Sequence, residues 1–149
     1  MSVSLTLARP EHLPVLLPLV ADMHAHLGLQ MTEEARRAAL LPLLEGVPQG
    51  AVYLIGPARA PIGYAVLAFG WSIELGGMDG YLDELYVRPA VRGRGIATEV
   101  LLELPRALAG AGLKALHVEV DREDAQTQRI YRKTGFRPRE RFMLMTRTF

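Results

Sequence analysis

The 149-residue sequence contains no cysteine and only 4 histidines. The lack of cysteine excludes disulfide bonds, cysteine-bound zinc and a covalent acyl-cysteine intermediate. His24 and His26 lie two positions apart, which would point them to different faces of a helix, so we expect no metal site. If the protein is an enzyme with a covalent mechanism, its nucleophile is therefore not a cysteine.

An excess of charge of one sign and long apolar runs are missing as well. The 17 basic and 16 acidic residues leave a formal net charge of +1, which gives no reason to expect a nucleic-acid partner. No apolar run approaches the roughly 20 residues that span a bilayer, and the N-terminus lacks a basic segment followed by an apolar core. We therefore expect a cytoplasmic protein that binds neither nucleic acid nor a membrane.

Half of the residues are hydrophobic, and a chain of 149 residues can enclose one substantial core more comfortably than two. We expect residues 1–149 to form a single domain. Hydrophobic periodicity and turn residues predict the element order β-α-α-β-β-β-α-β-α-β. This order is typical of an α/β or α+β fold in which helices flank a mixed sheet.

The sequence also predicts one long loop before a strand and a final strand near the C-terminus. The segment from Ser72 to Gly80 holds three glycines and is expected to be a loop that leads into a strand from Tyr81 to Arg88. Near the C-terminus, Phe142, Leu144 and Thr146 alternate with other residues and predict the closing strand of the sheet.

The most informative stretch runs from Tyr81 to Ala97 and reads Y-L-D-E-L-Y-V-R-P-A-V-R-G-R-G-I-A. It predicts a strand that stops at Pro89, a basic turn from Arg92 to Gly95, and a helix that begins near Ile96. Glycines in such a turn let backbone N–H groups approach a ligand, and the helix adds about half a positive charge at its N-terminus. A phosphate-bearing ligand is therefore expected, although neither G-x-x-x-x-G-K-[ST] nor G-x-G-x-x-G is present.

Two motifs in this half of the chain resemble those of one enzyme family. Arg92-x-x-Gly95-x-Ala97 resembles the Q/R-x-x-G-x-G/A pyrophosphate loop of the GNAT superfamily of N-acetyltransferases, and the preceding L-Y-V-R-P resembles the end of that family's fourth strand. About thirty residues later, I-Y-R-K-T-G-F at 130–136 resembles the family's [L/F]-Y-x-x-x-G-F segment, in which Gly135 would end a helix. The resemblance implies a GNAT-like, mostly antiparallel sheet and acetyl-CoA as cosubstrate.

The resemblance also implies roles for individual residues. Leu85 and Val87 would offer backbone groups to the pantetheine arm, and Tyr131 would stand near the thioester sulfur. Asp124 occupies a position where the family often has Asn, so its contact with CoA is left open. The pyrophosphate would be bound largely through the backbone N–H groups of Arg92, Gly93, Arg94, Gly95, Ile96 and Ala97.

The reaction implied is direct attack of an amine on acetyl-CoA in a ternary complex. An alkylamine is mostly protonated at neutral pH, so a base or a water chain must remove a proton, and Asp83 and Glu84 are the candidates. Adjacent strand residues point to opposite faces, so only one of them should face a cleft unless the strand carries a bulge. Position slightly favours Glu84, and a structural ion pair on the sheet is the alternative for either residue. Tyr131 would donate a hydrogen bond to the leaving thiolate.

The acceptor is the least defined part of the prediction. G-Y-L-D-E-L-Y-V at 80–87 is similar to polyamine and other small-amine acetyltransferases, so a primary amine of a small molecule is expected. A protein N-terminus or lysine is the main competing acceptor. A non-catalytic acyl-CoA-binding regulatory domain would keep the Arg92 loop but would need neither Tyr131 nor a carboxylate base. The resemblance also suggests a homodimer.

Overall fold

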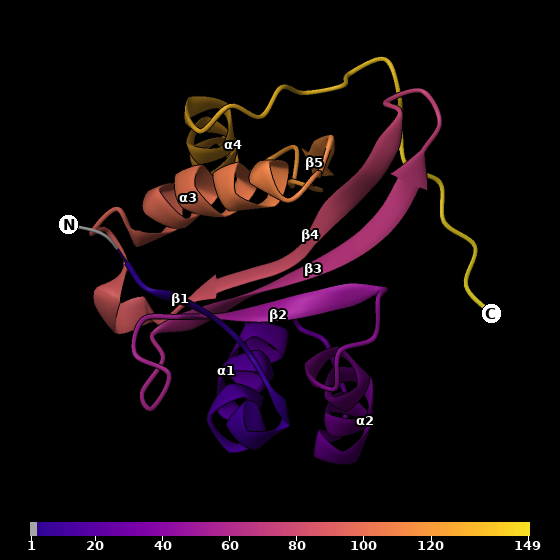
Figure 1. The fold of residues 1–149 in the computed structure, drawn as a ribbon. Helices are drawn as coiled ribbons and strands as arrows, with labels where there is room; N and C mark the ends of the chain where they lie inside the picture. The colour runs from indigo at the N-terminus through magenta and orange to yellow at the C-terminus, as the bar shows by residue number, and fades with distance from the viewer. Residues whose placement is uncertain (1–2) are drawn as a thin grey trace. The chain divides into compact units, whose positions relative to one another are not determined.

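The computed structural model of the protein describes residues 3–149, which form two compact units. The first unit ends at Glu119 and contains the sheet and three helices, α1, α2 and α3 (Figure 1). The second runs from Val120 to Phe149 and contains one helix, α4. No helix within residues 3–149 combines the length and the apolar character that crossing a membrane requires.

The first unit is built on a sheet with the strand order β1-β2-β3-β4-β5. Neighbouring strands are antiparallel except for β4 and β5, which are parallel. The prediction of a mixed, mostly antiparallel sheet flanked by helices is therefore confirmed. The strands are β1 (Leu5–Leu7), β2 (Gly50–Ile55), β3 (Gly63–Ser72), β4 (Gly77–Val87) and β5 (Ala115–His117).

Helices cover both faces of this sheet. Figure 1 shows α1 and α2 on one face and α3 on the other. The Thr32 hydroxyl caps α2 by accepting a hydrogen bond from the Ala35 N–H at 3.1 Å. The helical segments of this unit are η1 (Pro10–His12), α1 (Leu13–His26), α2 (Glu33–Leu44), η2 (Pro89–Val91) and α3 (Ile96–Gly110).

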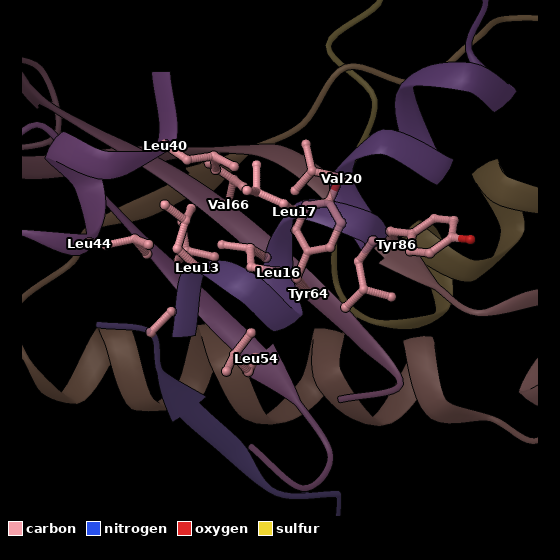
Figure 2. Packing of buried hydrophobic residues seen from close by; sticks show 13 residues of the cluster. Leu13, Leu16, Leu17, Val20, Leu40, Leu44, Leu54, Tyr64, Val66 and Tyr86 are labelled. Carbon is pink, nitrogen blue, oxygen red and sulfur yellow. The ribbon is translucent and has the colours of Figure 1, made fainter. Parts of the chain in front are cut away.

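The main hydrophobic core lies between the sheet and the pair α1 and α2. Leu16 of α1, Leu54 of β2 and Tyr64 of β3 are fully buried there (Figure 2). Burying one leucine side chain contributes about 1.5–3 kcal/mol, so this layer contributes strongly to the stability of the unit. It also fixes the face of β3 and β4 on which the candidate active site lies.

The expected loop from Ser72 to Gly80 is confined to residues 73–76, where Gly76 has a positive φ of 79°. β3 extends to Ser72, β4 begins at Gly77, and these two residues pair. Gly77 was expected in the loop, but it lies in β4, where the Lys114 side chain packs closely on it. A Cβ at this position would lie 3.1 Å from that side chain. The two strands therefore form a longer hairpin than the sequence predicts.

In the second unit, α4 spans Ala125–Lys133, whereas the predicted closing strand does not form. No residue from 134 to 149 is in a strand, and Phe142, Leu144 and Met145 are exposed. The Phe142 N–H instead donates to the Arg139 carbonyl within a turn. The prediction was wrong because alternation identifies a possible buried face, while a strand also needs a neighbour to complete its hydrogen bonds. The observed order follows the predicted one up to α4.

Candidate active site

β4 contains a β-bulge at its two predicted catalytic carboxylates. Val66 of β3 pairs with Glu84, whereas the next residue, Leu67, pairs with Leu82, so Asp83 has no partner in β3. Paired residues share a face of the sheet, and Val66 and Leu67 point to opposite faces, so Glu84 and Leu82 do as well. The bulge turns Glu84 toward α1 and α2. Because the strand is irregular here, the rule that neighbouring strand residues point to opposite faces does not decide how Asp83 is oriented relative to Glu84.

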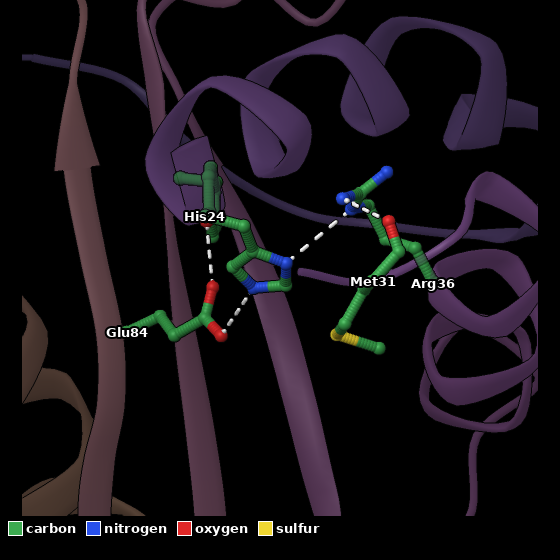
Figure 3. A network of polar contacts seen from close by, with 5 residues as sticks. His24, Met31, Arg36 and Glu84 are labelled. Carbon is green, nitrogen blue, oxygen red and sulfur yellow. Dashed lines mark hydrogen bonds and ion pairs between the residues drawn. The ribbon is translucent and has the colours of Figure 1, made fainter. Parts of the chain in front are cut away.

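Glu84 accepts hydrogen bonds at both of its carboxylate oxygens. His24 Nε2 of α1 lies 3.0 Å from Oε2 (Figure 3). The Tyr64 hydroxyl of β3 lies 2.7 Å from Oε1. Arg36 Nε of α2 in turn donates to His24 Nδ1 at 3.3 Å. The side chain of His24 is 6% exposed and that of Glu84 21%, so Glu84 keeps more contact with solvent than His24 does. The sequence did not predict that His24, Arg36 or Tyr64 contacts Glu84 or belongs to its hydrogen-bond network.

The Tyr64 phenol is held in its protonated form. Burial raises its pKa well above the ordinary value, and the hydrogen bond to Glu84 and the negative charge of Glu84 raise it further. Tyr64 is therefore a fixed hydrogen-bond donor to Glu84 and not a proton acceptor.

Asp83 has different surroundings from Glu84. The pKa of its carboxyl group is raised by partial burial, then by the negative charges of Glu84 and Glu119. The residue as a whole remains exposed, and no side-chain hydrogen bond holds its carboxylate within residues 3–149. The bulge therefore carries one fixed carboxylate and one that is free to turn.

The turn before α3 has the geometry expected of an anion-binding loop. Gly93 and Gly95 have positive φ angles of 78° and 77°, and a Cβ on either would have no other atom within 4 Å. Gly95 precedes the helix, has no side-chain cap, and its carbonyl accepts the first helical hydrogen bond, from the Glu99 N–H. Among residues 3–149, the backbone N–H groups from 93 to 98 have no acceptor. An anion at this helix N-terminus would satisfy them.

Arg92 fastens this loop to the end of β4. Its Nε donates to the Val87 carbonyl at 2.8 Å, and its guanidinium lies over the Tyr86 ring, 5.4 Å from the centroid. Both Arg92 and Arg94 are exposed, but the guanidinium of Arg92 is bonded to the protein. Ile96 and Ala97 are the first residues of α3, so the helix begins where the sequence predicts.

One edge of β4 is open next to this loop. β5 pairs with β4 only from Asp79 to Tyr81, so the segment 82–87, which contains Leu85 and Val87, has no strand partner on that side within residues 3–149. An open strand edge presents backbone N–H and C=O groups, the partners that the amides of a pantetheine arm require. Where β5 ends, His117 Nε2 lies 3.2 Å from Asp79 Oδ2 and the ring of His117 packs on Tyr81.

The Y-x-x-x-G-F motif of the second unit is the C-terminal end of α4. The Phe136 N–H donates to the Tyr131 carbonyl at 3.0 Å, and the Gly135 N–H donates to the Arg132 carbonyl at 3.2 Å, which is a Schellman motif. Gly135 has a φ of 105°, so its predicted role in ending the helix is confirmed. The rings of Tyr131 and Phe136 meet edge to face with centroids 5.2 Å apart, and burial raises the pKa of the Tyr131 phenol.

Asp124 is the N-cap of α4. Its carboxylate accepts hydrogen bonds from the Thr127 N–H at 3.0 Å and from the Thr127 hydroxyl at 2.6 Å, and these bonds lower its pKa. Both oxygens thus serve the helix, which leaves the predicted contact with CoA without support from the geometry. No group of three or more metal-ligating side chains within residues 3–149 is placed to hold a metal ion.

The sequence and the structure were compared with protein families and with solved structures. The model of the acetyltransferase (GNAT) family matches residues 22–136. An integron cassette protein from the mobile metagenome of Cole Harbour Salt Marsh is 30% identical, with a TM-score of 0.80 over 96% of this chain and 89% of that one. A protein of Arthrobacter sp. FB24 that is provisionally assigned as an acetyltransferase is 29% identical, with a TM-score of 0.78 over 90% of this chain and 85% of that one.

The aminoglycoside N-acetyltransferase AAC(6')-Iy, solved with a bisubstrate analog, is 17% identical, with a TM-score of 0.78 over 100% of both chains. At this identity the likeness concerns the fold alone. A comparison with curated proteins gives no match.

Proposed function

Because the chain belongs to the GNAT family of acetyltransferases, which use acetyl-CoA, we propose that it transfers the acetyl group of acetyl-CoA to a primary amine of a small molecule. The membership identifies an acetyl-CoA-dependent N-acetyltransferase, and the kind of acceptor is the proposed part. The family match runs from residue 22 to residue 136 and so includes both structural units, which supports one acetyltransferase domain over residues 1–149.

The observation that carries the proposal is the arrangement along β4 and the turn after it. The bulge with Glu84, the open edge at 82–87 and the unpaired N–H groups from 93 to 98 follow one another along the chain. In the proposed site the N–H groups bind the pyrophosphate, with Gly93, Arg94, Gly95, Ile96 and Ala97 at the turn. The backbone groups of Leu85 and Val87 orient the pantetheine arm. When bound, acetyl-CoA supplies the activated acetyl group.

Glu84 is the proposed base. It is the carboxylate of the bulge that two buried donors hold in one orientation. Its side chain is 21% exposed, and each carboxylate oxygen has a further lone pair for an acceptor ammonium or for a water. The amine loses its proton to this carboxylate, directly or through the water, and its lone pair then attacks the thioester carbonyl. Asp83 and Glu119 add negative charge beside it, which favours a cationic acceptor.

Tyr131 is the proposed hydrogen-bond donor to the departing sulfur. With ordinary pKa values of about 10 for a phenol and about 8.5 for a thiol, full proton transfer would be uphill by roughly 2 kcal/mol. Burial makes Tyr131 a still weaker acid, so the proton stays on its oxygen until charge develops on the sulfur. A hydrogen bond that strengthens in the transition state is sufficient for this role.

The experiment is an acceptor panel with purified protein and acetyl-CoA, read by the appearance of the free CoA thiol. Since the protein has no cysteine, a thiol reagent gives no background from the enzyme. The panel contains diamines, polyamines, aminoglycosides, peptides with free N-termini and lysine peptides, and a reaction without acceptor is the control. We expect turnover with small amines. Turnover confined to peptides would assign a protein substrate, and binding of acetyl-CoA without turnover on any acceptor would support the non-catalytic alternative.

A further inference from the structure

We propose that His24 and Arg36 are positioning residues for the proposed base, fixing the orientation of Glu84 and joining it to the connection between α1 and α2. The inference rests on the proposed function, because it assigns these two residues a task in the same reaction. Both residues are buried, with whole-residue exposures of 5% for His24 and 8% for Arg36, and they come from different helices. A polar pair of this kind inside an apolar layer needs a reason beyond packing.

The direction of the hydrogen bonds fixes the state of His24. The Nε of a guanidinium can only donate, so the Arg36 contact requires His24 Nδ1 to accept. The imidazole proton is therefore on Nε2, where it is donated to Glu84 Oε2. His24 is thus a neutral bridge between a cation and an anion, with donors and acceptors matched at every step.

Arg36 supplies the charge that balances Glu84. A buried guanidinium with no counter-charge would be strongly destabilising, and Glu84 is the carboxylate to which its hydrogen bonds lead. The Tyr64 hydroxyl donates to the other carboxylate oxygen, so Glu84 is held by two groups from different elements, β3 and α1. These two contacts define the direction in which the remaining lone pairs of Glu84 point.

Arg36 also reaches the connection between the two helices. Its NH2 nitrogen donates to the Met31 carbonyl at 3.2 Å (Figure 3), and the Leu29 N–H donates to the His24 carbonyl at 2.8 Å. The connection exposes Leu27, Leu29 and Met31 to solvent. A movement of this connection would therefore shift Arg36 and His24, and with them the carboxylate of Glu84. Small misplacements of a reacting group can cost on the order of 100-fold in rate, so this anchoring matters for turnover.

The test is a double-mutant cycle between Arg36→Met and Glu84→Gln, measured as kcat with an acceptor that the panel identifies. Arg36→Met is expected to lower kcat by about 10- to 100-fold while the calorimetric Kd for acetyl-CoA stays unchanged. In the Glu84→Gln background the same change should have little further effect, since both act through one carboxylate. Arg37→Met is the matched control, because Arg37 is the next residue on α2 and is exposed, and it should keep wild-type kcat.

His24 provides a second route that tolerates a folding defect in the Arg36 variant. His24→Leu should lower kcat like Arg36→Met, whereas His24→Gln, which can still present an N–H near the former Nε2, should recover most of it. Additive effects of Arg36→Met and Glu84→Gln, or equal losses in the two His24 variants, would overturn the positioning role. A wild-type kcat for Glu84→Gln would instead overturn the proposed base, so the two failures are distinguishable.

Discussion

The hydroxyl oxygen of Tyr64 lies 2.7 Å from Oε1 of Glu84, and both residues belong to the face of the sheet that α1 and α2 cover. Tyr64 is fully buried, so this bond joins the centre of the hydrophobic core to the proposed base. The stability of the fold and the geometry of the site therefore share one hydrogen bond. This relationship makes the pH dependence of stability informative about the site.

Tyr64 should make the folded state less stable at alkaline pH. Its pKa is raised in the folded state, whereas an unfolded tyrosine ionises near pH 10. Above that pH the unfolded state binds one proton fewer at this residue, so the free energy of unfolding falls as pH rises. Urea denaturation between pH 8 and pH 11 should show a steeper loss for the wild type than for Tyr64→Phe, which lacks the ionising group. Equal slopes would contradict the assignment.

Tyr131→Phe should lower turnover while leaving the affinity for acetyl-CoA nearly intact. The change removes the hydroxyl proposed to stabilise the departing thiolate but keeps the ring that packs edge to face on Phe136. Steady-state kinetics with a good acceptor and calorimetry with acetyl-CoA measure the two effects separately. An unchanged kcat would remove Tyr131 from the proposed mechanism.

Gly95→Ala should weaken acetyl-CoA binding by about 10-fold, because the new methyl group lies where backbone N–H groups would face the pyrophosphate. The same change forces a side chain into a positive φ of 77° and should lower the free energy of unfolding by about 1 kcal/mol.

Gly112→Ala is the matched control for this change. Gly112 follows the other end of α3, also has a positive φ, and also has open space at its Cβ. It should show a similar loss of stability in thermal unfolding without any change in the calorimetric Kd. If the two variants bind acetyl-CoA equally well, the turn does not hold the pyrophosphate.

Asp83→Asn should raise the KM for a cationic amine severalfold and leave kcat within a fewfold of the wild type. Asp83 is exposed and has no side-chain hydrogen bond within residues 3–149, so we expect it to contribute charge and not to act as the oriented base. Because the pKa of Asp83 is raised, the difference in KM should shrink as the pH falls through that pKa, beginning at a higher pH than for an ordinary aspartate. A collapse of kcat at all pH values would assign the base to Asp83 instead of Glu84.

The parts of the fold that local patterns determine were predictable. The Gly95 turn and the Gly135 helix end depend on positive φ angles that few residue types adopt, and both occur where the sequence places them. The closing strand was not predictable in the same way, since the alternation around Phe142 does not specify a partner strand.

The sequence predicted the site residues that are close together in the chain, but not those that other helices and strands bring to the site. Asp83, Glu84 and the turn at Arg92 are neighbours in sequence, so one motif could identify them. His24, Arg36 and Tyr64 come from three other elements, and each has an ordinary explanation by itself, as a helix-end histidine, a helical arginine or a core aromatic. Only the packing of α1 and α2 on the sheet joins them to Glu84. The bulge was likewise invisible, because a bulge depends on the register of two strands.

The open edge of β4 from 82 to 87 means that binding of the cosubstrate should also stabilise the folded state. A ligand whose amides bond to this edge completes the sheet much as a further strand would, but it can leave after each turnover. Since only the folded chain offers such an edge, mass action should stabilise the protein by about 2.7 kcal/mol when free ligand reaches 100 times its Kd. The cellular supply of acetyl-CoA would then govern how long the enzyme survives as well as how fast it works.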